Sequence, residues 1–135
     1  IPKHMDGKSL LKIMNKKNAI VKDHQAIIQT WGENQTHSLS IVSDNYKYLY
    51  WFYGEGMEPK EELYHLSKDA FELQNLVSNP IFGKKLDYMR QLYDDFVATW
   101  KDEAVPYNGY SKYAVLFNRH IPWKDKKHLM KTRKK

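Results

Sequence analysis

The sequence contains no cysteine, which excludes a disulfide, a thiol nucleophile and a thiolate zinc site. It also has no run of about 18 apolar residues, so no segment is predicted to span a membrane. The opening residues Ile1 to His4 lack the apolar region of a signal peptide. An opening Ile in place of Met indicates a fragment or a processed product.

The length and the distribution of charge predict one folded domain with a basic end. A chain of 135 residues with 41% hydrophobic content fits a single core. Residues 119–135 hold eight Lys and Arg against one Asp, a net charge of +7, so the total of +6 leaves −1 for residues 1–118. We therefore expect a folded domain over residues 1–123 and a basic, disordered tail over residues 124–135.

The stretch Ser43 to Tyr53 (SDNYKYLYWFY) is the most distinctive part of the sequence. Its residues 46–53 carry six aromatic rings and one charge, which is typical of a strand on a covered surface. Side chains alternate between the two faces of a strand, and here both faces are apolar. The pattern predicts a central strand with a helix over at least one face.

Three other segments have the character of strands. They are Ala26 to Trp31, His37 to Ser43 and Glu61 to Leu66. Asp44 and Asn45 separate two of these runs, and both residue types tolerate the positive φ of a two-residue hairpin turn. Four strands in an antiparallel sheet are therefore predicted.

Two short helices and one long helix are predicted. Gly7 to Asn15 is one short helix, and a capping box of Asp69 and Glu72 predicts a single helical turn. A long helix is predicted to begin at Asn79 and Pro80. Its main apolar stripe is Phe82, Leu86, Met89, Tyr93, Phe96 and Trp100, with a second row of Ile81, Tyr88, Leu92 and Val97.

These elements predict an α+β fold in which a four-stranded antiparallel sheet packs against one long C-terminal helix. Residues 106–123 follow that helix with two prolines, one glycine and five aromatic residues but no period. We expect this segment to be an irregular, aromatic-rich extension that wraps over the surface.

Candidate binding residues are few. The six His residues show no metal-binding spacing, so no metal site is predicted. Trp31, Tyr107, Asn108 and Tyr110 could form a sugar platform, because rings stack on pyranose faces and Asn supplies paired amide groups. Packing within the core or between subdomains is the alternative for these four residues.

Several motifs together resemble the C-terminal subdomain of type I sulfatases. Glu62 to Leu76 (ELYHLSKDAFELQNL) is similar to the family's ELYDL–DP–NL signature, although His65 replaces an Asp and Ala70 replaces a Pro. Met5 to Leu11 (MDGKSLL) resembles the segment that leads into this subdomain, and Ser43 to Tyr50 resembles one of its strands. Residues 107–123 resemble the extension of some bacterial polysaccharide-type members.

The resemblance also shows what this chain lacks. Type I sulfatases use a formylglycine made in a C/S-x-P/A-x-R motif, beside a calcium ion held by their N-terminal domain. No such motif occurs here. Sulfate-ester hydrolysis needs an activated nucleophile and an electrophilic clamp, so this chain is expected to contain no catalytic residue and no metal, and to be inactive alone.

The resemblance implies a role as the part of a sulfatase that completes the substrate cleft. The implied partner is an N-terminal catalytic domain, the substrate a sulfated glycan and the location periplasmic or extracellular. In the resembled fold His37 faces the cleft and could donate to a sugar hydroxyl or a sulfate oxygen; an exposed His at a strand end is the alternative. A stand-alone carbohydrate- or nucleic-acid-binding module remains the alternative function, although the nearly neutral body argues against nucleic acid.

Overall fold

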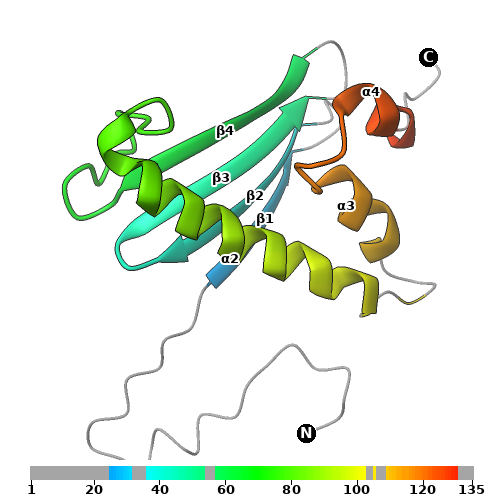
Figure 1. Cartoon of the computed structure of the whole chain (residues 1–135). Helices are drawn as coiled ribbons and strands as arrows, with labels where there is room; N and C mark the ends of the chain where they lie inside the picture. Colours follow the sequence, from blue (N-terminus) through cyan, green and yellow to red (C-terminus); the bar gives the residue numbers. More distant parts are fainter. Residues whose placement is uncertain (1–24, 32–35, 54–56, 103–104, 106–108, 131–135) are drawn as a thin grey trace, which may run out of the picture.

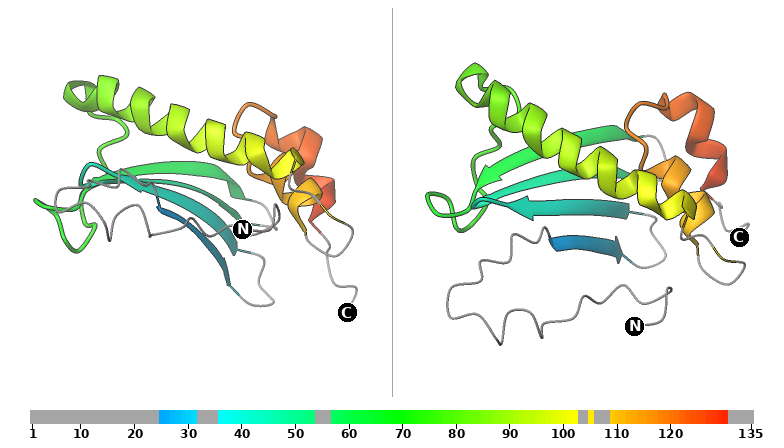
Figure 2. Two further views of the ribbon diagram at one scale, coloured as in Figure 1. Left: turned by 90° about the horizontal axis from the view of Figure 1, so that it is seen from below. Right: turned by 60° about the horizontal axis from the view of Figure 1, so that its bottom comes forward.

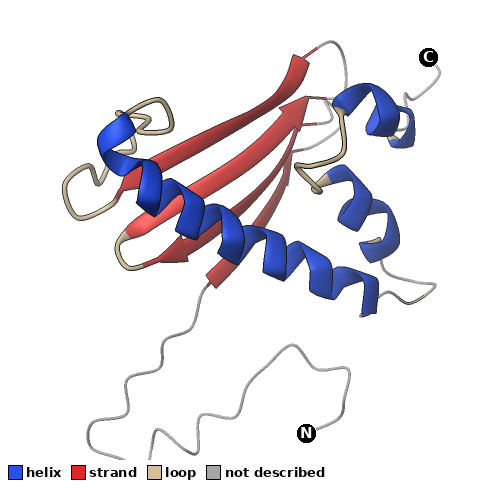
Figure 3. Cartoon of the chain, in the orientation of Figure 1, coloured by secondary structure: helices blue, strands red, loops and turns tan. Residues whose placement is uncertain are grey.

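The computed structural model describes residues 25–31, 36–53, 57–102, 105 and 109–130. They form an α+β fold, as predicted, in which helices lie on one face of an antiparallel sheet (Figures 1 and 3). The predicted helix Gly7 to Asn15 lies outside these residues. None of the helices in the described ranges combines the length and apolarity needed to cross a membrane.

The strands follow one another in the sheet in chain order. They are β1 (Gln25–Trp31), β2 (Thr36–Ser43), β3 (Tyr46–Tyr53) and β4 (Met57–His65), and each is antiparallel to its neighbour. The aromatic strand β3 is internal, as its two apolar faces predicted. The β2–β3 turn is the expected two-residue hairpin, in which Asp44 and Asn45 have φ of 50° and 62°.

The fourth strand begins earlier than predicted. The sequence indicated Glu61 to Leu66, but β4 starts at Met57 and includes Pro59. Pro59 has no N–H to donate, and an edge strand tolerates this because only one of its sides is paired. The pairing of β3 with β4 also shifts between Trp51 and Tyr53, close to this proline.

The helical turn predicted at Asp69 is wrong. The Asp69 carboxylate accepts hydrogen bonds from the N–H groups of Leu73 and Gln74 at 3.0 and 2.8 Å, four and five residues on, whereas a helix cap accepts from the second or third residue after it. Glu72 also has φ of 56°, a left-handed conformation that cannot continue a right-handed helix. The segment is therefore a fixed turn rather than a helix.

The long helix begins as its sequence predicted. The Asn79 side chain accepts a hydrogen bond from the Ile81 N–H at 3.1 Å, and Pro80 opens a 3₁₀ turn, η1 (Pro80–Phe82). The α-helix α2 (Gly83–Asp102) follows and lies along the sheet (Figure 2). In its main stripe Leu86, Met89, Tyr93 and Trp100 are buried, and Phe82 and Phe96 are partly buried.

The second predicted row of α2 is only half correct. Val97 is 5% exposed and Leu92 is partly buried, whereas Ile81 and Tyr88 are 85% and 41% exposed. The sheet covers an arc of the helix that is narrower than its apolar residues suggest, so the outermost positions face solvent.

The C-terminal extension is helical rather than irregular. It contains α3 (Tyr110–Leu116), α4 (Trp123–Lys126) and a 3₁₀ turn, η2 (Lys127–Leu129). Lys126 is fully buried and Met130 is 7% exposed. The predicted boundary between domain and tail at residues 123 and 124 therefore falls inside α4, because residues up to 130 pack on the domain.

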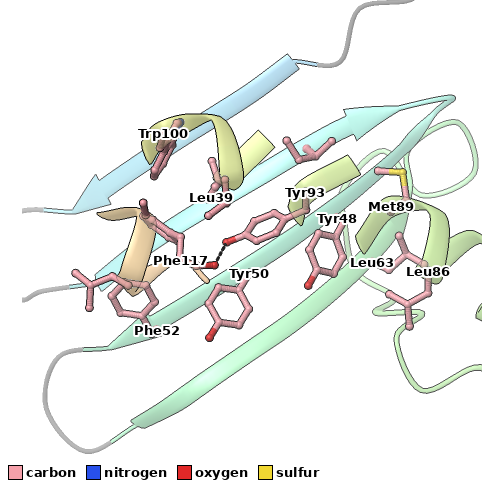
Figure 4. Close-up of a cluster of buried hydrophobic side chains, with 14 of the residues drawn as sticks. Leu39, Tyr48, Tyr50, Phe52, Leu63, Leu86, Met89, Tyr93, Trp100 and Phe117 are labelled. Atoms are coloured by element: carbon pink, nitrogen blue, oxygen red, sulfur yellow. Dashed lines mark hydrogen bonds between the residues drawn. The ribbon is translucent and has the colours of Figure 1, made fainter. Parts of the chain in front are cut away.

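The core lies between β2, β3 and β4 on one side and α2 with the extension on the other (Figure 4). The Tyr93 ring of α2 lies 5.3 Å from the Tyr48 ring and 5.9 Å from the Tyr50 ring, both on β3. The Tyr93 hydroxyl donates a hydrogen bond to the Phe117 carbonyl at 2.9 Å. One buried side chain thus joins the sheet, the long helix and the extension.

Replacing Met89 with Ala is expected to destabilise the fold by about 2–5 kcal/mol, because Met89 is fully buried between α2 and the sheet. Lys84→Ala on the exposed side of the same helix is the control, with an expected change within about 0.5 kcal/mol. Urea unfolding followed by circular dichroism measures both variants. Equal stability of the two variants would contradict this packing.

Candidate functional site

His37 lies in a partly buried aromatic setting at the start of β2. Its ring centroid is 5.4 Å from that of Phe52 and 5.6 Å from that of Tyr113 on α3. Burial, and secondarily the charge of Lys112, lower the pKa of His37, which favours a neutral ring at pH 7. Its buried Nδ1 has no hydrogen-bond partner, so one polar atom of the predicted site is left unsatisfied.

The other predicted site residues are only partly described. Tyr110 stacks on Trp100, with centroids 5.4 Å apart and an interplanar angle of 14°. Trp31 ends β1 opposite Thr36, and Tyr107 and Asn108 lie outside the described residues. The structure thus places His37 beside Tyr113 of α3, and it places Tyr110 at the start of α3 against the core residue Trp100. Whether these residues bind a sugar stays a prediction.

A charge network joins the sheet, α2 and the extension, and the sequence analysis missed it. Glu61 of β4 accepts hydrogen bonds from Arg90 Nε at 3.1 Å and from the Tyr48 hydroxyl at 2.5 Å. Arg119 of the extension donates to both carboxylate oxygens of Asp94 at 2.8 and 2.7 Å, and its Nη1 lies 3.8 Å from Glu61. Such two-point guanidinium pairs fix orientation as well as charge.

The network holds Glu61 in its charged form. Burial alone would raise the pKa of the Glu61 carboxyl, but the hydrogen bonds from Arg90 and Tyr48 and the nearby charges of Arg90 and Arg119 together lower it. Burial and the contact with Glu61 raise the pKa of the Tyr48 hydroxyl far above its ordinary value. Glu61 is therefore suited to holding cations in place and poorly suited to general acid catalysis.

An open cavity of about 460 Å³ lies beside this network, at the end of the sheet where β4 begins. Its lining residues come from β3, β4 and the extension: Tyr50, Glu58, Pro59, Glu61, Arg119, Ile121, Pro122, Trp123 and Lys124. None of these is a Ser, Thr, Cys or His that could act as a nucleophile. The mixture of cations, carboxylates and rings suits binding of a polar ligand.

The cavity wall is held in place by a buried lysine. Lys126 is fully buried, and its Nζ donates to the Tyr50 hydroxyl at 3.0 Å and to the Asn118 carbonyl at 2.6 Å. The same ammonium group lies 5.1 Å from the centroid of the Tyr50 ring. Burial lowers the pKa of Lys126 from 10.5 to about 8.

The aromatic strand β3 offers no open stacking platform on its helix side. Tyr48 and Phe52 are fully buried there and Tyr50 is 5% exposed. On the opposite face, the Trp51 Nε1 donates to Glu62 at 2.9 Å and the Tyr64 hydroxyl donates to the same carboxylate at 2.9 Å. Within the described residues, no three His, Cys, Asp or Glu residues lie together as metal ligands do.

Replacing Lys126 with Met is expected to change how stability depends on pH. Between pH 8 and pH 10 folded Lys126 has lost a proton that the unfolded chain keeps, so stability rises with pH by up to about 1.4 kcal/mol per unit. The raised pKa of Tyr50 opposes this rise only above pH 10. Lys126→Met should remove this rise in the free energy of unfolding, measured by urea denaturation across that pH interval. Lys124→Met should retain the rise. Parallel profiles of stability against pH for wild type and Lys126→Met would refute the lowered pKa of Lys126.

Comparison with known proteins identifies relatives for most of the chain. No family model matches. The chain is 30% identical over 92 residues to an arylsulfatase of Clostridium perfringens, covering 68% of this chain and 18% of that protein. It is 31% identical over 86 residues to a Δ4,5-hexuronate-2-O-sulfatase of Bacteroides thetaiotaomicron, covering 61% of this chain and 17% of the relative. The chain thus spans less than a fifth of either relative.

Solved structures share the fold. A protein solved in complex with its substrate D-glucosamine-2-N,6-O-disulfate superposes with a TM-score of 0.61 at 16% identity, covering 76% of this chain and 21% of the other. A 2-O glycosaminoglycan sulfatase superposes with a TM-score of 0.54 at 24% identity, covering 90% of this chain and 26% of the other. Sulfatases and solved structures of the same fold thus match most of this chain, and the match is consistent with the C-terminal subdomain of a sulfatase.

Proposed function

We propose that this chain is the C-terminal subdomain of a sulfatase and that its cavity forms one wall of the cleft for a sulfated glycan. The observation that carries the proposal is the cavity at Arg119 and Trp123, which the extension builds against β4. Its lining offers charge and aromatic surface but no Ser, Thr, Cys or His, and this composition suits a wall that binds substrate for a reaction performed elsewhere.

The remainder of the reaction is assigned to a catalytic domain in the same polypeptide. The sulfatase relatives are more than five times as long as the region that matches. The formylglycine nucleophile and the calcium ion implied by the family resemblance belong to that domain. A periplasmic or extracellular location is proposed with the same function, because sulfated polysaccharides are extracellular polymers.

Lys124 and Trp123 are the lining residues best placed to meet a glycan. Lys124 is exposed, so its ammonium is available to a sulfate group. Trp123 is half-buried and packs 5.2 Å from Phe52, which fixes its ring at the cavity wall. Arg119 is already bound by Asp94, so it orients the wall rather than supplying a free charge.

Not all of the site residues predicted from the sequence keep a role in the proposed function. His37 stays in the proposal as a donor by the family resemblance, and this role falls to its Nε2, because its Nδ1 is buried. Stacking of Tyr110 on Trp100 favours the packing alternative for that residue. Trp31, Tyr107 and Asn108 remain proposed parts of a sugar platform, because rings stack on pyranose faces and Asn supplies paired amide groups.

Lys124→Ala in the full-length protein is expected to raise KM for a sulfated oligosaccharide about fivefold, because an exposed ion pair contributes up to about 1 kcal/mol. The kcat for that substrate and the hydrolysis of a small aryl sulfate, which does not reach this wall, should stay unchanged. Lys127→Ala is the matched control, because Lys127 is equally exposed on the same segment but does not line the cavity.

Two results would overturn the proposed function. One is a full-length gene product without a C/S-x-P/A-x-R motif outside this chain. The other is equal KM values for the Lys124→Ala and Lys127→Ala variants on every sulfated oligosaccharide that the enzyme accepts.

A further inference from the structure

We propose that a loop at the end of the sheet opposite the cavity docks this subdomain onto the catalytic domain, by inserting Phe71 and Leu73 into an apolar pocket there. The loop comprises residues 69–75 and is called the clamped loop. This inference rests on the proposed function, because the docking partner is the rest of the sulfatase polypeptide. It names an interaction surface rather than a substrate contact.

The two apolar side chains of the clamped loop are almost fully exposed. Phe71 is 84% exposed and Leu73 is 83% exposed. Isolated exposed apolar residues are common on protein surfaces, but two large ones in one short loop form a patch that favours a protein partner. Buried Phe and Leu side chains also contribute large apolar area to protein interfaces.

The loop that carries them is held rigidly by its polar groups. The Asp69 carboxylate accepts from the backbone of Leu73 and Gln74, and Glu72 forms an ion pair of 2.7 Å with Lys47 of β3. The Asn75 side chain accepts from the Leu63 and Val77 N–H groups at 3.1 Å each. A loop fixed in this way loses little further entropy on docking.

The backbone conformation at Glu72 points to the same role. Its φ of 56° is unfavourable for a residue other than glycine, Asn or Asp, at a cost on the order of 1 kcal/mol. This turn directs the Glu72 side chain to Lys47 and leaves its two neighbours, Phe71 and Leu73, in solvent. The chain thus keeps a strained turn whose apolar side chains bury nothing within the described residues.

The position of the loop favours a domain-sized partner. Lys47 lies on the face of β3 opposite α2, so the Glu72 ion pair brings the clamped loop to the sheet face that no described helix covers (Figure 2). The half-exposed Leu49 and Trp51 lie on that same face. Leu73 offers a glycan neither a hydrogen bond nor a stacking ring, whereas the relatives have over four fifths of their length outside the matching region.

The test compares two variants of the full-length protein. The double variant Phe71→Ser with Leu73→Ser should lower Tm by about 2–4 °C or more and speed proteolysis at the junction before this chain, because the docked pair is lost. Ile81→Ser is the matched control, since Ile81 is 85% exposed but lies outside the clamped loop. It should leave both readouts unchanged.

Three outcomes would overturn the docking proposal. The first is equal behaviour of the double variant and the Ile81→Ser variant. The second is an equal loss of stability when the same double substitution is made in the 135-residue chain alone, because the two side chains would then serve this fold itself. The third is a wild-type dimer that the double variant converts to monomer without a change in proteolysis, because the partner would then be a second copy.

Failure here is distinguishable from failure of the proposed function. If the full-length protein is an active sulfatase and both variants behave alike, the proposed function stands and only the docking proposal is refuted. A full-length protein with no sulfatase motif would refute the proposed function, whereas faster proteolysis of the double variant in that protein would still show that the clamped loop docks onto another part of the polypeptide.

Discussion

The packing of α2 on the aromatic strand β3 is the constraint on which the rest of the structure depends. Tyr93 and Trp100 bring large side chains to the buried face of the sheet, where Tyr48 and Phe52 have no solvent exposure. Each such side chain contributes about 1.5–3 kcal/mol when buried. This contact stabilises the sheet from one face, and no helix of the described residues covers the other face.

The same contact determines where the polar groups go. The buried Tyr93 hydroxyl donates to the Phe117 carbonyl, and the adjacent Asp94 binds Arg119. Lys126 donates to the Tyr50 hydroxyl. The first two contacts attach the extension to α2 and the third attaches it to β3, and the cavity lies where the extension meets the sheet. The extension is thus ordered by hydrogen bonds and ion pairs to residues distant in the sequence, and its buried charges are partnered as buried charges must be.

Local patterns account for most of the fold. Alternation identified β2 and β3, the Asp44–Asn45 pair identified the hairpin, and Asn79 with Pro80 identified the start of the long helix, since each is a property of neighbouring residues. The turn at Asp69 failed for a specific reason. Its capping residues are present, but Glu72 adopts a left-handed conformation as it pairs with Lys47, which is 25 residues away.

The sequence by itself determined the strand pattern, the amphipathic helix, the absence of a sulfatase nucleophile motif and the family resemblance. Each of these depends only on residues that are close together in the sequence. Only the tertiary structure decided that Arg119, Glu61 and Trp123 border one cavity and that Lys126 is buried. Lys126 meets Tyr50 from 76 positions away, and no local period connects such distant residues. Their meeting depends on how the extension returns across the sheet, which is a matter of packing rather than of sequence pattern.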